Sequence, residues 1–137
     1  MVLPTAVPGR TGAPHWVAPV LVGASVLAAT AVLALRSPED PGSYPACPFH
    51  ALTGWWCPAC GSLRAVHALA HGDLATAVDR NVLLVLAVPL LTVAWLAWAA
   101  GRRRVALPAA AGWVLAGTVI AFWVLRNVPA GSWLAPT

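Results

Sequence analysis

The sequence predicts an all-α membrane protein, with three transmembrane helices and one cysteine-containing extramembrane loop. Of its 137 residues, 60% are hydrophobic and only 9% are charged, whereas about a quarter of the residues in soluble domains are charged. The chain also contains three separate apolar stretches of bilayer length. All of its cysteines lie between residues 47 and 60, in the longest polar interval between these stretches.

The first apolar stretch follows a proline-containing segment, residues 1–15, which we expect to be a flexible N-terminal tail. Residues 16–35 carry only Ser25 and Thr30 as polar side chains. About twenty helical residues span roughly 30 Å, the thickness of the bilayer core. A cleavable signal peptide is the alternative, but the apolar region of a signal peptide is only about 7–15 residues long. We therefore predict a retained transmembrane helix.

Two further apolar stretches follow, at residues 82–100 and 107–125. Pro89 lies inside the first of them, where we expect it to kink the helix. The C-terminal tail, residues 126–137, follows the last stretch. None of the three stretches contains a charged residue, which argues against a pump, a proton relay or an ion-coupled transporter.

The distribution of arginines predicts how the chain is oriented. Arg102, Arg103 and Arg104 lie in the short link between the last two stretches, and basic residues in short loops mark the cytoplasmic side. The N-terminus is then cytoplasmic and the cysteine segment extracytoplasmic, in a multi-pass protein of the cell inner (cytoplasmic) membrane. The lipid bilayer is thus the expected partner. The eight basic residues are spread over the chain and form no nucleic-acid-binding face.

The extramembrane segment, residues 36–81, is predicted to begin as a loop and to end in two short interfacial helices. Residues 37–46 are rich in proline, glycine and serine, which favour turns. Ser62 is expected to cap a helix that ends near residue 70. Asp73 is expected to cap a second short helix that continues through Asp79.

A dense motif lies in this segment: Cys47-Pro48, Thr53-Gly54, Cys57-Pro58, Cys60-Gly61 and Arg64-Ala65, then Leu69, Gly72-Asp73 and Asn81. It resembles the pattern C-P…T-G-x-x-C-P-x-C-G-x-x-R-A of an uncharacterised family of small bacterial multi-pass membrane proteins, a domain of unknown function. The resemblance covers about 45 residues. It implies a membrane location and no particular activity.

The cysteine spacing is compatible with a metal site. Cys57 and Cys60 form a Cys-x-x-Cys pair, and Cys47 and His50 repeat this spacing with a histidine as the second ligand. Three thiolates and one imidazole suit tetrahedral zinc. Zinc is the one cofactor that the sequence suggests.

The same residues support a redox interpretation. Cys60 precedes a predicted helix N-terminus, where the helix dipole lowers the pKa of a thiol. Cys57 and Cys60 would form the redox pair, Cys47 would exchange with them, and Arg64 would stabilise a thiolate or pair with a nearby aspartate. A third alternative is a disulfide or metal that only staples the loop. The residue pattern leaves all three open.

The functional prediction is an accessory or scaffold subunit whose outer loop is held by its cysteines, with a larger membrane protein complex as its partner. The small size, the uncharged apolar stretches and the lack of a catalytic acid–base pair favour a non-enzymatic role. The rival is a membrane thiol–disulfide oxidoreductase that uses Cys57 and Cys60. A redox titration would separate the two.

Overall fold

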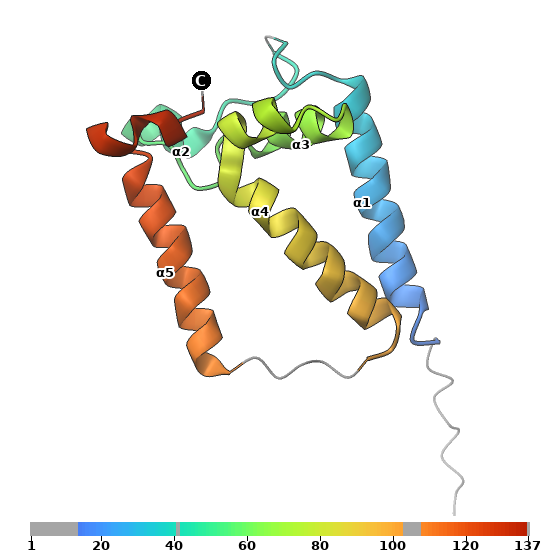
Figure 1. The fold of residues 1–137 in the computed structure, drawn as a ribbon. Helices are drawn as coiled ribbons and strands as arrows, with labels where there is room; N and C mark the ends of the chain where they lie inside the picture. Colours follow the sequence, from blue (N-terminus) through green and yellow to red (C-terminus); the bar gives the residue numbers. More distant parts are fainter. Residues whose placement is uncertain (1–13, 41, 103–107, 137) are drawn as a thin grey trace, which may run out of the picture.

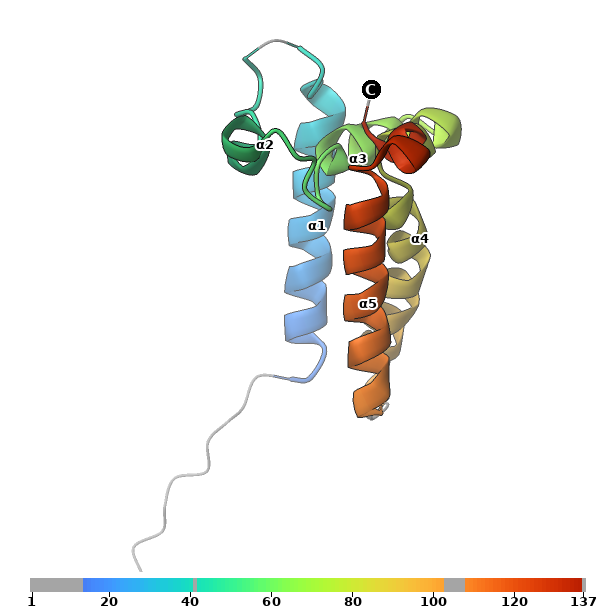
Figure 2. The ribbon, with the colours of Figure 1, turned by 90° about the vertical axis from the view of Figure 1, so that its left-hand side faces the viewer.

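The computed structural model describes residues 14–40, 42–102 and 108–136, and all regular structure in these ranges is helical. The elements are α1 (Val17–Leu35), α2 (Pro48–Thr53), α3 (Ser62–Ala70), α4 (Leu74–Ala99), α5 (Ala109–Leu125) and the 3₁₀ helix η1 (Pro129–Leu134). Three long helices extend from one end of the molecule, where α2, α3, η1 and the start of α4 gather (Figures 1 and 2). We call this end the cap. The C-terminal residues also lie there.

The long helices correspond to the three apolar stretches of the sequence. Helices α1 and α4, with 19 and 26 residues, are long and apolar enough to cross a membrane. Helix α5 is equally apolar but has 17 residues, fewer than the roughly 20 that usually span a bilayer core. The predicted N-terminal tail up to residue 13 and two of the three clustered arginines, Arg103 and Arg104, lie outside the described residues.

Helix α4 changes direction near its start, at Asn81, where the backbone is extended (φ −162°, ψ 91°). The part before Asn81 lies across the cap, and the part after it descends from the cap (Figure 1). The predicted helix from Asp73 to Asp79 is therefore the first part of α4. Asp73 caps it as expected, because its Oδ1 accepts a hydrogen bond from the Thr76 N–H at 3.0 Å. The backbone stays helical at Pro89, where a kink was predicted.

Small side chains allow α3 and α4 to pack closely. The buried core of the described chain includes Ala65, Ala68 and Ala77, surrounded by the half-buried Leu69, Leu84 and Val85. A ring nitrogen of His67 lies 2.6 Å from the Leu33 carbonyl oxygen and ties α3 to α1. These contacts place the cap firmly on α1 and α4, so that it can position a site.

Candidate metal centre

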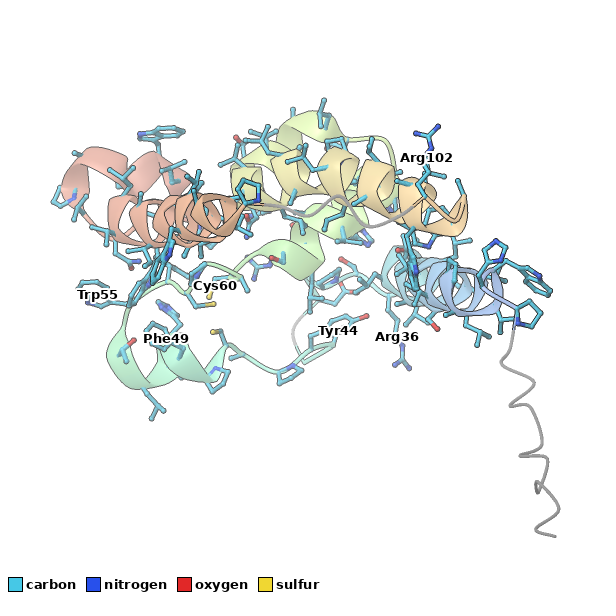
Figure 3. All side chains as sticks on the ribbon, turned by 90° about the horizontal axis from the view of Figure 1, so that it is seen from below. Arg36, Tyr44, Phe49, Trp55, Cys60 and Arg102 are labelled. Atoms are coloured by element: carbon cyan, nitrogen blue, oxygen red, sulfur yellow. The ribbon has the colours of Figure 1, made fainter. Side chains whose placement is uncertain are left out.

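The three cysteines converge in the cap, where Cys47 meets the pair Cys57 and Cys60. Their Sγ atoms all lie within 4.8 Å of one another. The Cys57 Sγ is 2.9 Å from the Cys60 Sγ and 3.6 Å from the Cys47 Sγ. Cys60 is buried, and the other two are half-buried. Figure 3, seen from below, shows Cys60 on the same side of the molecule as Phe49 and Trp55, away from Arg36 and Arg102.

Two local structures carry these thiols. Cys47 immediately precedes α2, and Pro48 occupies the first position of that helix, where the missing N–H of proline has no cost. Cys57 and Cys60 belong to one tight turn: the Cys60 N–H donates to the Cys57 carbonyl at 3.1 Å, and the Cys57 N–H donates to the Cys60 Sγ at 3.2 Å. The turn therefore aims both thiols to the same side.

Gly61 ends this turn. Its backbone conformation and the lack of space for a side chain both require glycine at this position. Its φ of +83° lies in the left-handed region, which side chains rarely adopt. A Cβ atom at this position would also overlap the Arg80 carbonyl oxygen and press on Pro136. Glycine thus lets the cysteine turn lie directly against α4 and the C-terminal segment.

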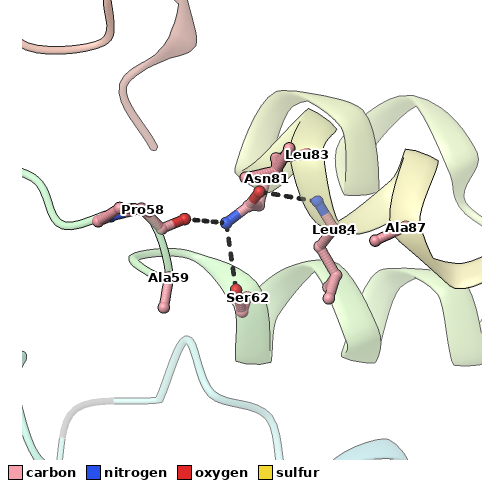
Figure 4. Close-up of a pocket in the computed structure, with 7 residues that line it drawn as sticks. All are labelled: Pro58, Ala59, Ser62, Asn81, Leu83, Leu84 and Ala87. Atoms are coloured by element: carbon pink, nitrogen blue, oxygen red, sulfur yellow. Dashed lines mark hydrogen bonds between the residues drawn. The ribbon is translucent and has the colours of Figure 1, made fainter. Parts of the chain in front are cut away.

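Asn81 holds the turn from the α4 side (Figure 4). Its Nδ2 donates to the carbonyl oxygens of Pro58 and Cys60, at 3.0 and 3.2 Å, and to the Ser62 hydroxyl at 3.1 Å. Its Oδ1 accepts from the Leu84 N–H at 3.0 Å and so caps the descending part of α4. The prediction that Ser62 caps α3 is wrong, because Gly61 holds the capping position and the Ser62 hydroxyl is the acceptor for Asn81.

Arg126 holds the same turn from the end of α5. Its side chain is 1% exposed. Its Nη1 donates to the carbonyl oxygens of Cys57 and Pro58 at 3.0 and 3.3 Å, and its Nη2 donates to that of Cys60 at 3.3 Å. Its guanidinium carbon also lies 4.8 Å from the centre of the Phe122 ring. A cation is thereby fixed against the backbone of the cysteine turn.

The thiols differ in how readily they ionise. The backbone N–H of His50, in the first turn of α2, lowers the pKa of Cys47. Burial raises the pKa of Cys60 to about 12, because removal from water penalises the charged form. The expectation that Cys60 is the activated thiolate is therefore wrong: burial outweighs the effect of the helix that follows it.

The other predicted site residues lie elsewhere. His50 is outside the group of three sulfurs. Its ring stacks on Trp56 with centroids 3.8 Å apart, and its Nδ1 is buried without a hydrogen-bond partner. Arg64 forms no ion pair within the described residues; the pair found there joins Arg80 to Glu39. The cation against the cysteine turn is Arg126 instead.

The sequence pattern predicts no role in the site for Arg126, which directly follows the third apolar stretch. Asn81 is part of the sequence motif, but the motif does not indicate which groups Asn81 binds.

A shallow groove of about 230 Å³ borders the turn and is lined by Pro58, Ala59, Ser62, Asn81, Leu83, Leu84 and Ala87 (Figure 4).

This geometry can hold a metal ion. Two thiolates bound to tetrahedral zinc at about 2.3 Å lie about 3.8 Å apart. The separation of Cys47 and Cys57, 3.6 Å, is close to this value. The separation of Cys57 and Cys60 is 2.9 Å and would have to widen by about 1 Å.

Comparison with known proteins relates the cysteine segment to a family but gives no activity for it. The comparisons with curated proteins and with solved structures give no match. Residues 47–95 match a family model described as "Protein of unknown function (DUF2752)". The match includes the three cysteines and Asn81 and ends before α5. The cysteine segment and most of α4 thus fit an uncharacterised family.

Proposed function

We propose that this chain is a small integral membrane protein whose cap binds a thiophilic metal ion, zinc in the first instance, through Cys47, Cys57 and Cys60. The observation that carries this proposal is the convergence of three sulfur atoms within 4.8 Å. Thiolates are the ligands that zinc and other soft ions favour. Two buried side chains, Asn81 and Arg126, fix the backbone of the turn that supplies two of the three sulfurs.

The surface of the long helices supports a membrane location. Leu27 on α1 and Leu90 on α4 are each 72% exposed, and Trp113 on α5 is 80% exposed. In water such surface would be costly, whereas lipid solvates it. We propose that α1, α4 and α5 each cross the inner membrane, with the N-terminus in the cytoplasm and the cap outside. Trp55 of the cap then lies at the headgroup level, where tryptophan is enriched.

Metal analysis of the purified chain tests the proposed site. The chain would be extracted from membranes in detergent under anaerobic, reducing conditions, and metal and free thiols would be counted per chain. About one divalent ion per chain is expected, with serine variants of Cys47, Cys57 and Cys60 each losing most of it. If the wild-type protein were metal-free and fully reduced and bound no added Zn²⁺, the proposed metal-binding function would be wrong.

The fourth ligand is tested separately with His50→Ala. Zinc sites with three protein ligands take water or an external group in the remaining position. If His50 turns from Trp56 to the ion, the alanine variant should weaken Zn²⁺ binding by at least about tenfold. Unchanged binding would assign the fourth position to an external ligand.

A second candidate function, thiol–disulfide exchange, rests on the central position of Cys57. Its sulfur lies next to both Cys60 and Cys47. An external disulfide could accept two electrons and two protons from Cys57 and Cys60, giving two thiols and an internal disulfide. Redox titration in the absence of metal tests this: a couple near cellular potentials supports exchange, and a bond that resists physiological reductants supports a structural staple.

The accessory role remains a proposal of its own. The described helices have exposed apolar faces, and the chain is small for an independent membrane enzyme. Mild-detergent purification from native membranes would show whether a larger complex accompanies it. A single species of the chain's own mass in detergent, after cross-linking in intact membranes, would contradict an accessory role.

A further inference from the structure

Among the residues that the structure describes, Arg126 is a buried cation without an acidic partner. The chain has four acidic residues, and all of them lie in the described part. The ion pair found there joins Glu39 to Arg80. Arg126 meets carbonyl oxygens and the Phe122 ring instead, and its Nε has no partner.

An unpaired charge in such a position is costly. Removal of an ion from water remains unfavourable even after relaxation of the protein, and carbonyl dipoles offset only part of this cost. Buried charges are therefore normally paired. Arg126 faces Cys57 and Cys60 across the backbone of the turn. The thiol site is therefore the candidate for the missing negative charge.

We propose that this anion is a tris-thiolate complex of a divalent thiophilic cation, formed by Cys47, Cys57 and Cys60, with Arg126 as its counter-ion. This inference rests on the proposed metal centre and specifies its charge. Three thiolates and a divalent ion leave one negative charge, which the guanidinium neutralises. A monovalent ion held by three thiolates, or three neutral thiols, would leave a net charge buried in the cap.

The binding step involves no electron transfer. The three S–H bonds break, three metal–sulfur bonds form, and the three protons pass to solvent. Arg126 touches the turn rather than the ion and is a positioning residue.

Two variants separate the charge of Arg126 from its hydrogen bonds. Arg126→Lys keeps the charge but loses the planar fork, whereas Arg126→Gln keeps an amide donor without the charge. Zn²⁺ affinity of the full chain in detergent would be measured by competition with a chelator. We expect Arg126→Gln to weaken binding on the order of tenfold to a hundredfold, and Arg126→Lys to recover most of that loss. Arg36→Gln, an exposed arginine at the end of α1, is the matched control.

Proton release provides a second measurement that needs no variant. Calorimetry of wild-type Zn²⁺ binding in buffers of different ionisation enthalpy should give between two and three protons per ion near neutral pH. One proton or fewer would overturn the tris-thiolate complex even if the Arg126 variants fail to fold. Wild-type affinity in Arg126→Gln, or equal losses in the Gln and Lys variants, would overturn the counter-ion role alone. Absence of Zn²⁺ binding by the wild type would instead reject the metal centre itself.

Discussion

Asn127 and Trp56 bind each other through two opposed hydrogen bonds. The Asn127 Oδ1 accepts from the Trp56 N–H at 2.7 Å, and the Asn127 Nδ2 donates to the Trp56 carbonyl at 2.9 Å. The two residues are 71 positions apart in the sequence. Together with Arg126, this pair fastens the end of α5 to the loop that carries Cys57.

Removal of the Asn127 side-chain amide should weaken the attachment of α5 to the cap. We expect Asn127→Ala to lower the free energy of unfolding by about 1–3 kcal/mol, because the polar backbone atoms of Trp56 lose their partners. Thermal unfolding in detergent measures the loss. Thr118→Ala, whose hydroxyl bonds only to Val114 within α5, is the control and should change little. Equal stability of the two variants would mean that α5 is not held through Asn127.

Gly61 should tolerate replacement less well than Gly72. Gly61 and Gly72 both have a positive φ, +83° and +78°, but only Gly61 lacks room for a Cβ atom. Gly72→Ala should therefore cost about 1–2 kcal/mol from backbone strain alone. Gly61→Ala should cost clearly more, because the turn must also move away from Arg80. Thermal unfolding of both variants checks this, and similar losses would show that no close approach exists.

Asn81 should contribute more to stability than the hydroxyl it binds. Asn81→Ala removes the capping acceptor for Leu84 and the donor to two carbonyl oxygens, so we expect a loss of about 2–3 kcal/mol. Ser62→Ala removes one of these interactions and should cost about 1 kcal/mol or less. Chemical unfolding in mixed micelles would rank the two variants. A larger loss of stability in Ser62→Ala than in Asn81→Ala would contradict the role of Asn81 in holding the turn.

The thiols should react at different rates in the reduced, metal-free protein. Because its pKa is lowered, Cys47 should be alkylated by iodoacetamide at a lower pH than an ordinary thiol. Cys60 should react last, since burial both shields it and raises its pKa to about 12. Peptide mass spectrometry over time gives the order. Early modification of Cys60 would contradict the packing of the turn.

The raised pKa of Cys60 also predicts how stability depends on pH. Below the ordinary thiol pKa of 9.0, the folded and unfolded chains both retain this proton; between 9.0 and about 12 only the folded chain does. Rising pH should therefore destabilise the metal-free protein across this range. Cys60→Ala should flatten this part of the stability profile. An unchanged slope in that variant would assign the effect to another group.

The proposed orientation predicts which side of the membrane each end occupies. A reporter that is active only in the cytosol should be inactive when fused after Thr137. In intact cells, a membrane-impermeant maleimide should label Cys47 under reducing conditions. Reporter activity, or labelling only after the cells are permeabilised, would place the cap in the cytoplasm. Fusion of the same reporter to the N-terminus is the control and should be active.

Local chemistry was enough to predict several elements of the fold. The apolar stretch at residues 16–35 corresponds to α1, and Asp73 caps the helix that follows it. The start of α3 was displaced by one residue, because Ser62 is used by Asn81 instead of by its own helix. The spacing of the cysteines identified them as one site. It also suggested His50 as a ligand, which the structure stacks on Trp56.

Residue types and short-range spacing are enough to predict that this chain is helical and apolar, and that its cysteines are concentrated between residues 47 and 60. These properties act within a few turns of chain. Long-range packing places Arg126 against the cysteine turn and raises the pKa of the Cys60 thiol by burial. Both depend on which distant segments exclude water from the cysteine turn, and that is settled only when the end of α5 packs against the cap.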